Sequence, residues 1–310
     1  MIASAARARL ASVSRWRSTR VWSRCIGDLG RGGESSGGVL AVIVPAFNEE
    51  QTIGRVLRRI LLQPCVQQVV LVDDGSTDRT LEIAREFTRD ARVIVRLHRI
   101  NRGKGAAIRT GLGLVTAPIV IIQDADMEYD PTEYGAMIEP ILTGRADVVY
   151  GVRGFASHTA YSYWFVLGNR LVTMATNVLF NCYIQDMETG FKAMRADLMR
   201  RLRLAGKRFD IEPEITARVL RLGYRIHEVP IAYYARSREE GKKLTWRDGV
   251  KALVILLRLR ILPRSLLFGR PDEYHARRRS ELSAVPRLPE LPEERLIDVG
   301  SAATPGSRSR

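Results

Sequence analysis

The sequence predicts an α/β fold: a doubly wound, mostly parallel sheet with helices on both faces. Short runs rich in Val and Ile alternate with segments whose apolar residues recur at helical spacing. Strands that alternate with helices in this way form right-handed βαβ units, which build parallel sheets. Polar and acidic residues follow three of the runs, and such sheets bind ligands at the carboxyl ends of their strands. The pattern therefore predicts the fold class and the sheet edge that carries the site.

The individual elements follow in chain order. The expected strands cover residues 39–44, 69–72, 93–97, 119–122 and 148–150. Pro45 ends the first of them. From Glu49 the apolar positions recur at i, i+3, i+4, i+7 and i+8, which predicts an amphipathic helix. The next two expected helices cover residues 80–87 and 105–114, and after residue 150 the alternation weakens.

The formal charge of +15 points to anionic partners, namely nucleic acid, an acidic membrane or a phosphorylated substrate. Only six of the 49 basic residues are lysines, an arginine excess that we attribute in part to a GC-rich genome rather than to function. The three cysteines are widely scattered, which indicates neither a disulfide framework nor a zinc site and fits a reducing cytosol. We therefore expect a cytoplasmic protein.

Both ends of the chain differ in composition from its middle. Residues 1–38 are rich in Arg, Ser, Ala and Gly. They resemble a transit peptide, and a disordered basic tail or a start codon placed too far upstream explains them equally well. Residues 269–310 turn to Arg, Pro, Glu and Ser and predict a second disordered tail. We expect the chemistry between these tails, in a main domain over 39–235 and a further segment over 236–268.

Two apolar stretches are too short or too polar to span a bilayer, which takes roughly 20 mostly apolar residues. Residues 161–180 contain Asn169 and Arg170 at their centre, and residues 252–257 run directly into Arg258. We expect core or interface helices, with membrane-surface elements as the alternative. Arg258, Arg260 and Arg264 alternate with apolar residues, as in a basic amphipathic helix lying on anionic lipid. An anionic membrane surface is thus an expected peripheral partner.

Asp124 and Asp126 follow the apolar run 119–122 directly. Two carboxylates two residues apart at the end of a strand can both bind one divalent cation. Mg²⁺ and Mn²⁺ prefer such oxygen ligands and usually share them with substrate phosphates. The pair therefore predicts a metal–diphosphate site, although acidic pairs at strand ends are also often solvated caps.

Two further turns can bind a nucleotide. Residues 73–78, Asp-Asp-Gly-Ser-Thr-Asp, follow the second strand, where a carboxylate can accept from a base N–H or a ribose hydroxyl. Residues 101–105, Asn-Arg-Gly-Lys-Gly, place two cations at the start of a helix, which suits a diphosphate. No GxxxxGK[ST] motif occurs and no GxGxxG follows the first strand, so P-loop and dinucleotide-binding readings are disfavoured.

Four successive motifs carry a specific resemblance: VPAFNEE, VDDGSTD, NRGKGAAIRTG and QDADMEYDP. They resemble those of the family-2 inverting glycosyltransferases of GT-A fold, most closely the dolichol- and polyprenyl-phosphate sugar synthases. The match continues through DMETGFKAMR, RFDIEPEI, EVPI and REEGKKLTWRDG. It implies a GT-A domain with a Rossmann-like nucleotide-binding half. The QDADMEY stretch differs from the DADLQ-type continuation of the better-known synthases, and the transmembrane helices of some relatives are not expected here.

The resemblance also implies roles for individual residues. Donor-binding residues would be Pro45, Asn48, Glu49, Lys104 and Asp124, with Asp73 or Asp74 holding the base and ribose of a UDP- or GDP-linked sugar. Asp124 and Asp126 would carry Mg²⁺ or Mn²⁺ on the donor diphosphate. Residues acting in catalysis would be Asp126, Asp186 and Glu188, the last two in an acidic motif on the acceptor side.

The acceptor decides whether a base is needed. A polyprenyl phosphate is already anionic near neutral pH, because its second pKa is about 6. It needs cations more than a general base, and the candidates are Arg153, Arg236, Arg238, Lys242 and Lys243. A sugar or other hydroxyl acceptor would instead require Asp186 or Glu188 as the base. A basic nucleic-acid-binding protein is the third alternative, but no recognition motif is present, so we expect no nucleic-acid partner.

Overall fold

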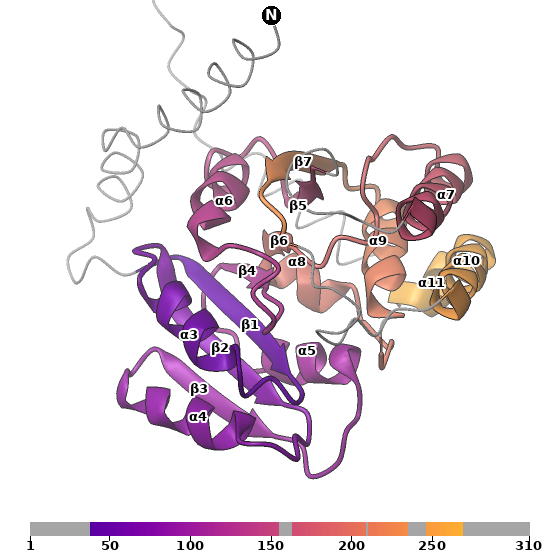
Figure 1. The fold of residues 1–310 in the computed structure, drawn as a ribbon. Helices are drawn as coiled ribbons and strands as arrows, with labels where there is room; N and C mark the ends of the chain where they lie inside the picture. The colour runs from indigo at the N-terminus through magenta and orange to yellow at the C-terminus, as the bar shows by residue number, and fades with distance from the viewer. Residues whose placement is uncertain (1–37, 155–162, 209, 235–245, 269–310) are drawn as a thin grey trace, which may run out of the picture. The chain divides into compact units, whose positions relative to one another are not determined.

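The structure is a computed structural model that describes residues 38–154, 163–208, 210–234 and 246–268. Its strands form one seven-stranded sheet with the order β3-β2-β1-β4-β6-β5-β7 (Figure 1). The strands are β1 (Leu40–Ala46), β2 (Val66–Asp73), β3 (Val93–Leu97), β4 (Ile119–Ile122), β5 (Val148–Arg153), β6 (Lys192–Arg195) and β7 (Ile226–Ile231). The α-helices are α3 (Ile53–Leu61), α4 (Thr80–Glu86), α5 (Lys104–Leu112), α6 (Tyr134–Leu142), α7 (Tyr163–Phe180), α8 (Ala196–Arg201), α9 (Ile211–Leu222), α10 (Trp246–Ile261) and α11 (Arg264–Phe268).

The predicted mostly parallel sheet is confirmed. Strands β1 to β4 pair in parallel, and β5 pairs in parallel with β7. Strand β6 is the exception, because it runs antiparallel to both of its neighbours, β4 and β5. It joins the nucleotide-binding half predicted from the motifs to the second half of the sheet.

Helices cover both faces of the sheet, as a doubly wound fold requires. In β1 the side chains of Leu40, Val42 and Val44 pack into one core with α3 and α6. The side chains of Ala41 and Ile43 point to the opposite face, into a second core with α5, α8 and α9. Both faces of β1 are therefore apolar, which is why the strand is a continuous apolar run in the sequence.

The prediction that Pro45 ends the first strand is wrong, because β1 continues through Pro45 to Ala46. Backbone groups of alternate residues in a strand point to the same neighbour. The Ile43 carbonyl accepts from Gln123 on the β4 side, so Pro45 also faces that side, where β4 has already ended at Ile122. The missing N–H of Pro45 therefore costs no ladder hydrogen bond.

A third, smaller core lies beside α9. Residues Val172 of α7, Ala217 of α9, and Ala252 and Leu256 of α10 pack together in it. Both apolar stretches of the second half are thus helices of the folded body. No helix within the described ranges is long and apolar enough to cross a membrane.

Residues 1–37 of the tail predicted over 1–38, and the whole tail predicted over 269–310, lie outside the described residues. So do residues 235–245, and with them Arg236, Arg238, Lys242 and Lys243.

Gly103, at the start of α5, provides a test of the fold. Its φ is +92°, and a Cβ there would lie 2.2 Å from the Lys207 carbonyl oxygen. Gly144 is a matched control, since its φ is +71° but a Cβ would meet nothing within 4 Å. We expect Gly144→Ala to cost about 1 kcal/mol of backbone strain. Gly103→Ala should cost about 1 to 3 kcal/mol more, because its ψ of 157° lies in a region that essentially only glycine adopts and because the Cβ would clash with Lys207. Urea unfolding measures both, and equal losses would contradict the close packing of α5.

Candidate active site

The carboxyl ends of β1, β2 and β4 meet at one edge of the sheet, and hydrogen bonds hold their loops together. The Asn48 side chain accepts from the Thr77 amide at 2.9 Å, so the loop after β1 is bound to the loop after β2. The Thr52 hydroxyl donates to the Ala125 carbonyl at 2.8 Å and to the Glu49 carboxylate at 2.9 Å. Asn48 and Glu49 therefore position the donor-side loops. The predicted pocket residue Pro45 lies in β1 directly before them.

The structure distinguishes the two acids at the end of β2. Both oxygens of Asp74 are bound by protein groups: one by His98 Nδ1 at 2.6 Å and the Arg102 amide at 3.0 Å, the other by the Gly103 amide. Asp73 is fully buried, and its Oδ1 has no hydrogen-bond partner. A buried carboxylate oxygen without a partner is unfavourable, so Asp73 is the acid suited to a donor group on a ligand.

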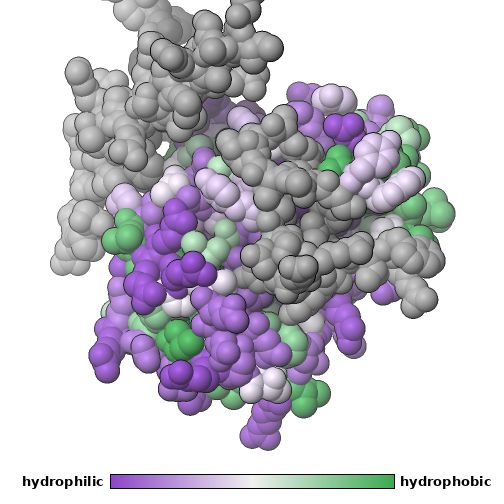
Figure 2. All heavy atoms as spheres, viewed as in Figure 1, coloured by the Kyte–Doolittle hydropathy of each residue, from purple (hydrophilic) through white to green (hydrophobic). Residues whose placement is uncertain are grey.

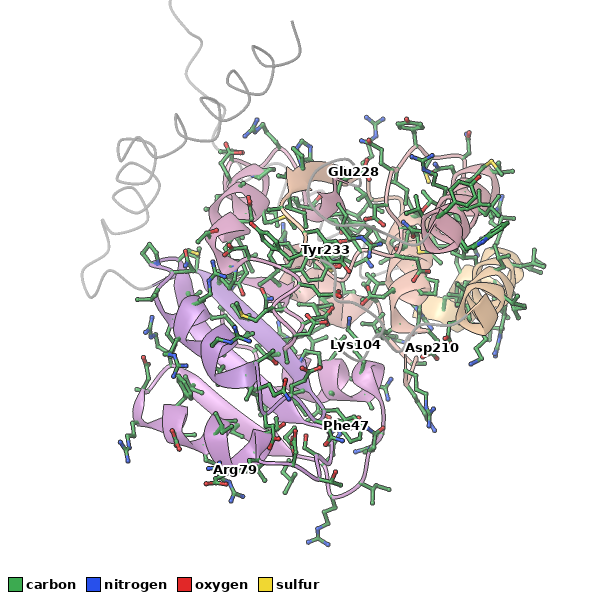
Figure 3. The ribbon with its side chains drawn as sticks, viewed as in Figure 1. Phe47, Arg79, Lys104, Asp210, Glu228 and Tyr233 are labelled. Carbon is green, nitrogen blue, oxygen red and sulfur yellow. The ribbon has the colours of Figure 1, made fainter. Side chains whose placement is uncertain are left out.

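Lys104 lies at the centre of the site, at the first turn of α5. Its ammonium is 2.7 Å from Asp124 Oδ1 and 3.0 Å from Glu212 Oε1. Burial opposes the charge, but the Asp124 and Glu212 carboxylates outweigh it and hold the pKa of Lys104 above its usual value. Lys104 is therefore a fixed cation at this edge of the sheet (Figure 3).

Glu212, at the start of α9, continues this charge network inward. Its carboxylate also pairs with Lys192 of β6, whose side chain is completely buried. Burial alone would raise the pKa of Glu212, but Lys192 and Lys104 together lower it below its usual value. A buried carboxylate between two cations keeps its charge, so Glu212 fixes the position of Lys104 in the site.

The Asp124 and Asp126 pair fits a hard divalent cation. Asp124 faces the Lys104 ammonium, so this position already attracts a cation. Space beside it is limited: a Cβ on Gly190 would lie 2.6 Å from Asp124 Oδ2, so only glycine fits there without displacing the carboxylate. Asp126 is partly exposed, and one of its oxygens accepts from the Glu128 amide at 3.2 Å. Two oxygen-donating side chains at an open sheet edge suit Mg²⁺ or Mn²⁺.

Aromatic residues pack behind the loop of residues 123–130, which contains Asp124 and Asp126. Tyr129 stacks on Phe191 with ring centroids 5.1 Å apart, and its hydroxyl accepts from the Gly190 amide at 2.9 Å. Tyr233 donates its hydroxyl hydrogen bond to Glu128. Glu128 therefore connects the loop after β4 to the chain after β7.

Two predicted residues, Arg153 and Asp186, form a buried pair at the acceptor side. Arg153 Nε lies 2.6 Å and Nη2 2.7 Å from the two oxygens of Asp186. Asn169 of α7 donates to the same carboxylate at 3.1 Å. The Arg153 guanidinium also lies 5.2 Å from the centre of the Tyr233 ring. In this structure Arg153 thus balances Asp186, and its role as a ligand of the acceptor phosphate stays a prediction.

Glu188 differs from Asp186 in its surroundings. Its Oε1 is buried without a hydrogen-bond partner. Burial raises the pKa of Glu188 from 4.5 to about 7, because the favourable effect of Lys192 is smaller than the cost of desolvation. A carboxyl group that titrates near neutral pH can exchange a proton, so Glu188 is the better of the two candidate bases.

With this geometry described, comparison with known proteins identifies the family. Residues 41–203 match the model for glycosyl transferase family 2. The chain belongs to this family. It is 32% identical over 200 residues to a dolichyl-phosphate hexose transferase of Haloferax volcanii, covering 64% of this chain and 85% of that protein. It is 27% identical over 208 residues to a dodecaprenyl-phosphate galacturonate synthase of Rhizobium johnstonii, covering 64% of this chain and 60% of that protein.

Solved structures agree on the fold. Glucosyl-3-phosphoglycerate synthase from Mycobacterium tuberculosis in complex with Mg²⁺ and UDP superposes with a TM-score of 0.58 at 23% identity, covering 80% of this chain and 85% of that one. Its complex with Mn²⁺, UDP-glucose and phosphoglyceric acid gives 0.58 at 25% identity, covering 77% and 84%. The predicted GT-A fold is confirmed, and the protein is a glycosyltransferase.

Sequence reasoning missed several residues that complete the site. Tyr129, Lys192 and Glu212 lie within quoted motifs, whereas Asn169 of α7 and Tyr233 lie outside them. One signal could have indicated Lys192, which lies between the apolar residues Phe191 and Ala193. Glu212 gave no such signal, because acids such as Glu212 and Glu214 are common in the first turn of a helix. Charged residues at expected core positions need buried partners of opposite sign.

Glu188 provides a pH test of the site. As the pH rises from about 4.5 to 7, the unfolded chain ionises Glu188 before the folded protein does, so the native state loses stability in this window. We expect Glu188→Gln to have nearly the wild-type free energy of unfolding near pH 4, where Glu188 is mostly protonated in both the folded and the unfolded wild type. At pH 8 the variant should exceed the wild-type value by about 3 kcal/mol, at about 1.4 kcal/mol per unit of pKa shift. Urea titrations at both pH values measure it. A difference independent of pH would contradict the burial of this carboxyl group.

Proposed function

We propose that the protein transfers one sugar from a UDP- or GDP-linked donor to a polyprenyl phosphate, with inversion, at the cytosolic face of an anionic membrane. The observation that carries the donor half is the cluster of Asp73, Lys104 and Asp124 at one sheet edge. The unpartnered oxygen of Asp73 suits a base, and the fixed cation Lys104 suits a diphosphate. Asp124, which faces that cation, suits a metal ion. The names of the Haloferax and Rhizobium relatives support the lipid-phosphate half.

Different residues of the chain would bind different parts of the donor. Asp73 accepts a hydrogen bond from the base or ribose, and Lys104 binds a diphosphate oxygen as a point charge. Asp124 and Asp126 would hold Mg²⁺ or Mn²⁺, which supplies charge that neutralises the departing diphosphate. The described part of the chain has no cluster of three or more His, Cys, Asp or Glu arranged for a metal, so diphosphate oxygens and water would complete the coordination.

Transfer with inversion is a single displacement. An acceptor oxygen attacks the anomeric carbon from the side opposite the diphosphate, a new carbon–oxygen bond forms, and the bond to the diphosphate breaks. A phosphate oxygen is already ionised, so this route needs no proton acceptor. The chain's contribution is alignment and charge balance.

Glu188 favours a second candidate, transfer to a hydroxyl group. A hydroxyl acceptor must lose a proton, and a carboxylate with a pKa of about 7 can accept it. The two candidates share the donor half and differ only in the need for Glu188.

Two arms of one kinetic experiment test the proposal. In the first, Asp126→Ala should abolish Mn²⁺-dependent binding of UDP or GDP in calorimetry and lower turnover by about a hundredfold or more, since metal charge contributes several kcal/mol. Asp147→Ala is the matched control, because that carboxylate is 40% exposed and pairs only loosely with Arg195 at 3.8 Å. Unchanged metal-dependent binding in Asp126→Ala would contradict the donor site.

The second arm varies the acceptor. A short-chain prenyl phosphate should support turnover in both the wild type and Glu188→Gln, whereas the corresponding prenol should not. If the wild type turns over phosphate-free acceptors and Glu188→Gln does not, the acceptor is a hydroxyl group and the lipid-phosphate proposal is wrong.

A further inference from the structure

Helices α7, α10 and α11 expose large apolar side chains on the side away from the sheet. Their inner faces pack into the third core, and the opposite faces are open. The exposed residues are Trp164, Leu171, Met174 and Val178 of α7, Val250, Val254, Leu257 and Ile261 of α10, and Leu266 of α11. Figure 2 shows hydrophobic residues gathered at the right-hand margin, where α7 and α10 lie. We call these residues the apolar face.

The apolar face belongs to two helices that run side by side in the same direction. A Cβ on Gly249, near the start of α10, would lie 3.9 Å from Val172 of α7. Near the end of α10, Arg260 donates to the Leu179 carbonyl of α7 at 2.7 Å. The sequences of α7, α10 and α11 together contain six basic residues and one acid, Asp248. An apolar surface with this charge matches an anionic membrane.

At the end of this face, Arg221 of α9, Arg260 and Arg264 surround a cavity of about 220 Å³, which Phe180, Asn181 and Leu220 also line. We call it the three-arginine pocket. Ile261 and Leu266, which are 72% and 73% exposed, neighbour its arginines in the sequence. A charged pocket thus adjoins the apolar face.

Contacts to backbone carbonyls fix the three arginines. Arg221 donates to the carbonyls of Arg260 and Leu262 at the end of α10, and Arg264 donates to the Arg221 carbonyl at the end of α9. These bonds satisfy carbonyls that a helix end leaves without partners. They hold the guanidinium groups in place, but carbonyl groups carry only partial charges and leave most of the positive charge unbalanced.

No carboxylate among the described residues forms an ion pair with any of the three arginines. The Nε of Arg221 is buried and has no hydrogen-bond partner. Burial, and then the charges of Arg260 and Arg264, lower the pKa of Arg221. The pocket therefore concentrates positive charge, and a phosphate group offers the negative charge that would balance it.

We propose that the three-arginine pocket binds the phosphate of an anionic phospholipid whose acyl chains lie against the apolar face. The apolar neighbours Ile261 and Leu266 favour a lipid over a soluble phosphate, since only the lipid covers them. This inference rests on the membrane location proposed above but not on the acceptor, so vesicles without any prenyl phosphate suffice to test it.

The test is flotation of the full chain with vesicles of phosphatidylcholine, alone or mixed in equal amounts with phosphatidylglycerol, at about 0.15 M salt. Arg260→Lys and Arg264→Lys keep the charge but lose the forked guanidinium, and each should weaken binding to the mixed vesicles by about tenfold. Arg258→Lys is the matched control, an exposed arginine of the same helix that does not line the pocket. It should bind within about twofold of the wild type. Thermal melts check that each variant is folded.

Three outcomes would overturn the proposal. Equal binding by all three lysine variants and the wild type would mean that the charge acts without a pocket. A wild type that ignores phosphatidylglycerol would remove the membrane partner. The third outcome combines two observations: inorganic phosphate raises the melting temperature of the wild type but not of Arg264→Lys, and the wild type does not bind vesicles. It would assign the pocket to a soluble anion. If a lysine variant fails to fold, competition of inorganic phosphate against wild-type vesicle binding decides, and absence of competition counts against the pocket.

Discussion

The balance of buried charge around Lys104 determines how the rest of the site is built. Its ammonium is held between Asp124 at the end of β4 and Glu212 at the start of α9, and Glu212 is in turn paired with Lys192 in β6. These contacts connect the parallel half of the sheet to the antiparallel strand beside it. Charges taken out of water are tolerated only when their partners are in place. The loop after β4, the start of α5, the start of α9 and strand β6 are therefore positioned by one network.

A second buried pair serves the acceptor side in the same way. Asp186 is bound by Arg153 of β5 and Asn169 of α7. Arg153 packs on Tyr233, which donates to Glu128 in the loop after β4. Donor and acceptor sides thus meet through Glu128 and Tyr233. Glu188 is buried with one oxygen unpartnered, and this burial raises its pKa.

The features that depend on local sequence patterns could be predicted from the sequence. Continuous apolar runs predicted strands buried on both faces, and the residues after them predicted the sheet edge that holds the site. Pairing between distant segments was not predictable in this way. Strand β6 has only four residues, and its partners β4 and β5 fix it as a strand. Asp73 and Asp74 are equivalent in the sequence, and only the approach of His98 and the Gly103 amide distinguishes them. The sequence also does not reveal that Arg153 is paired with Asp186, because the two residues are 33 positions apart in the chain.

The most direct test of the central claim is to measure Mn²⁺ binding to Lys104→Met by electron paramagnetic resonance. The measurement is made with and without UDP or GDP, whichever binds the wild type better. In the structure the Lys104 ammonium pairs with Asp124, where a metal ion would compete with it. Removing it should therefore strengthen binding of Mn²⁺ alone, while binding of the Mn²⁺–diphosphate complex weakens because a cation for the phosphates is lost. Two affinities that fall together, or that both stay at their wild-type values, would contradict the account.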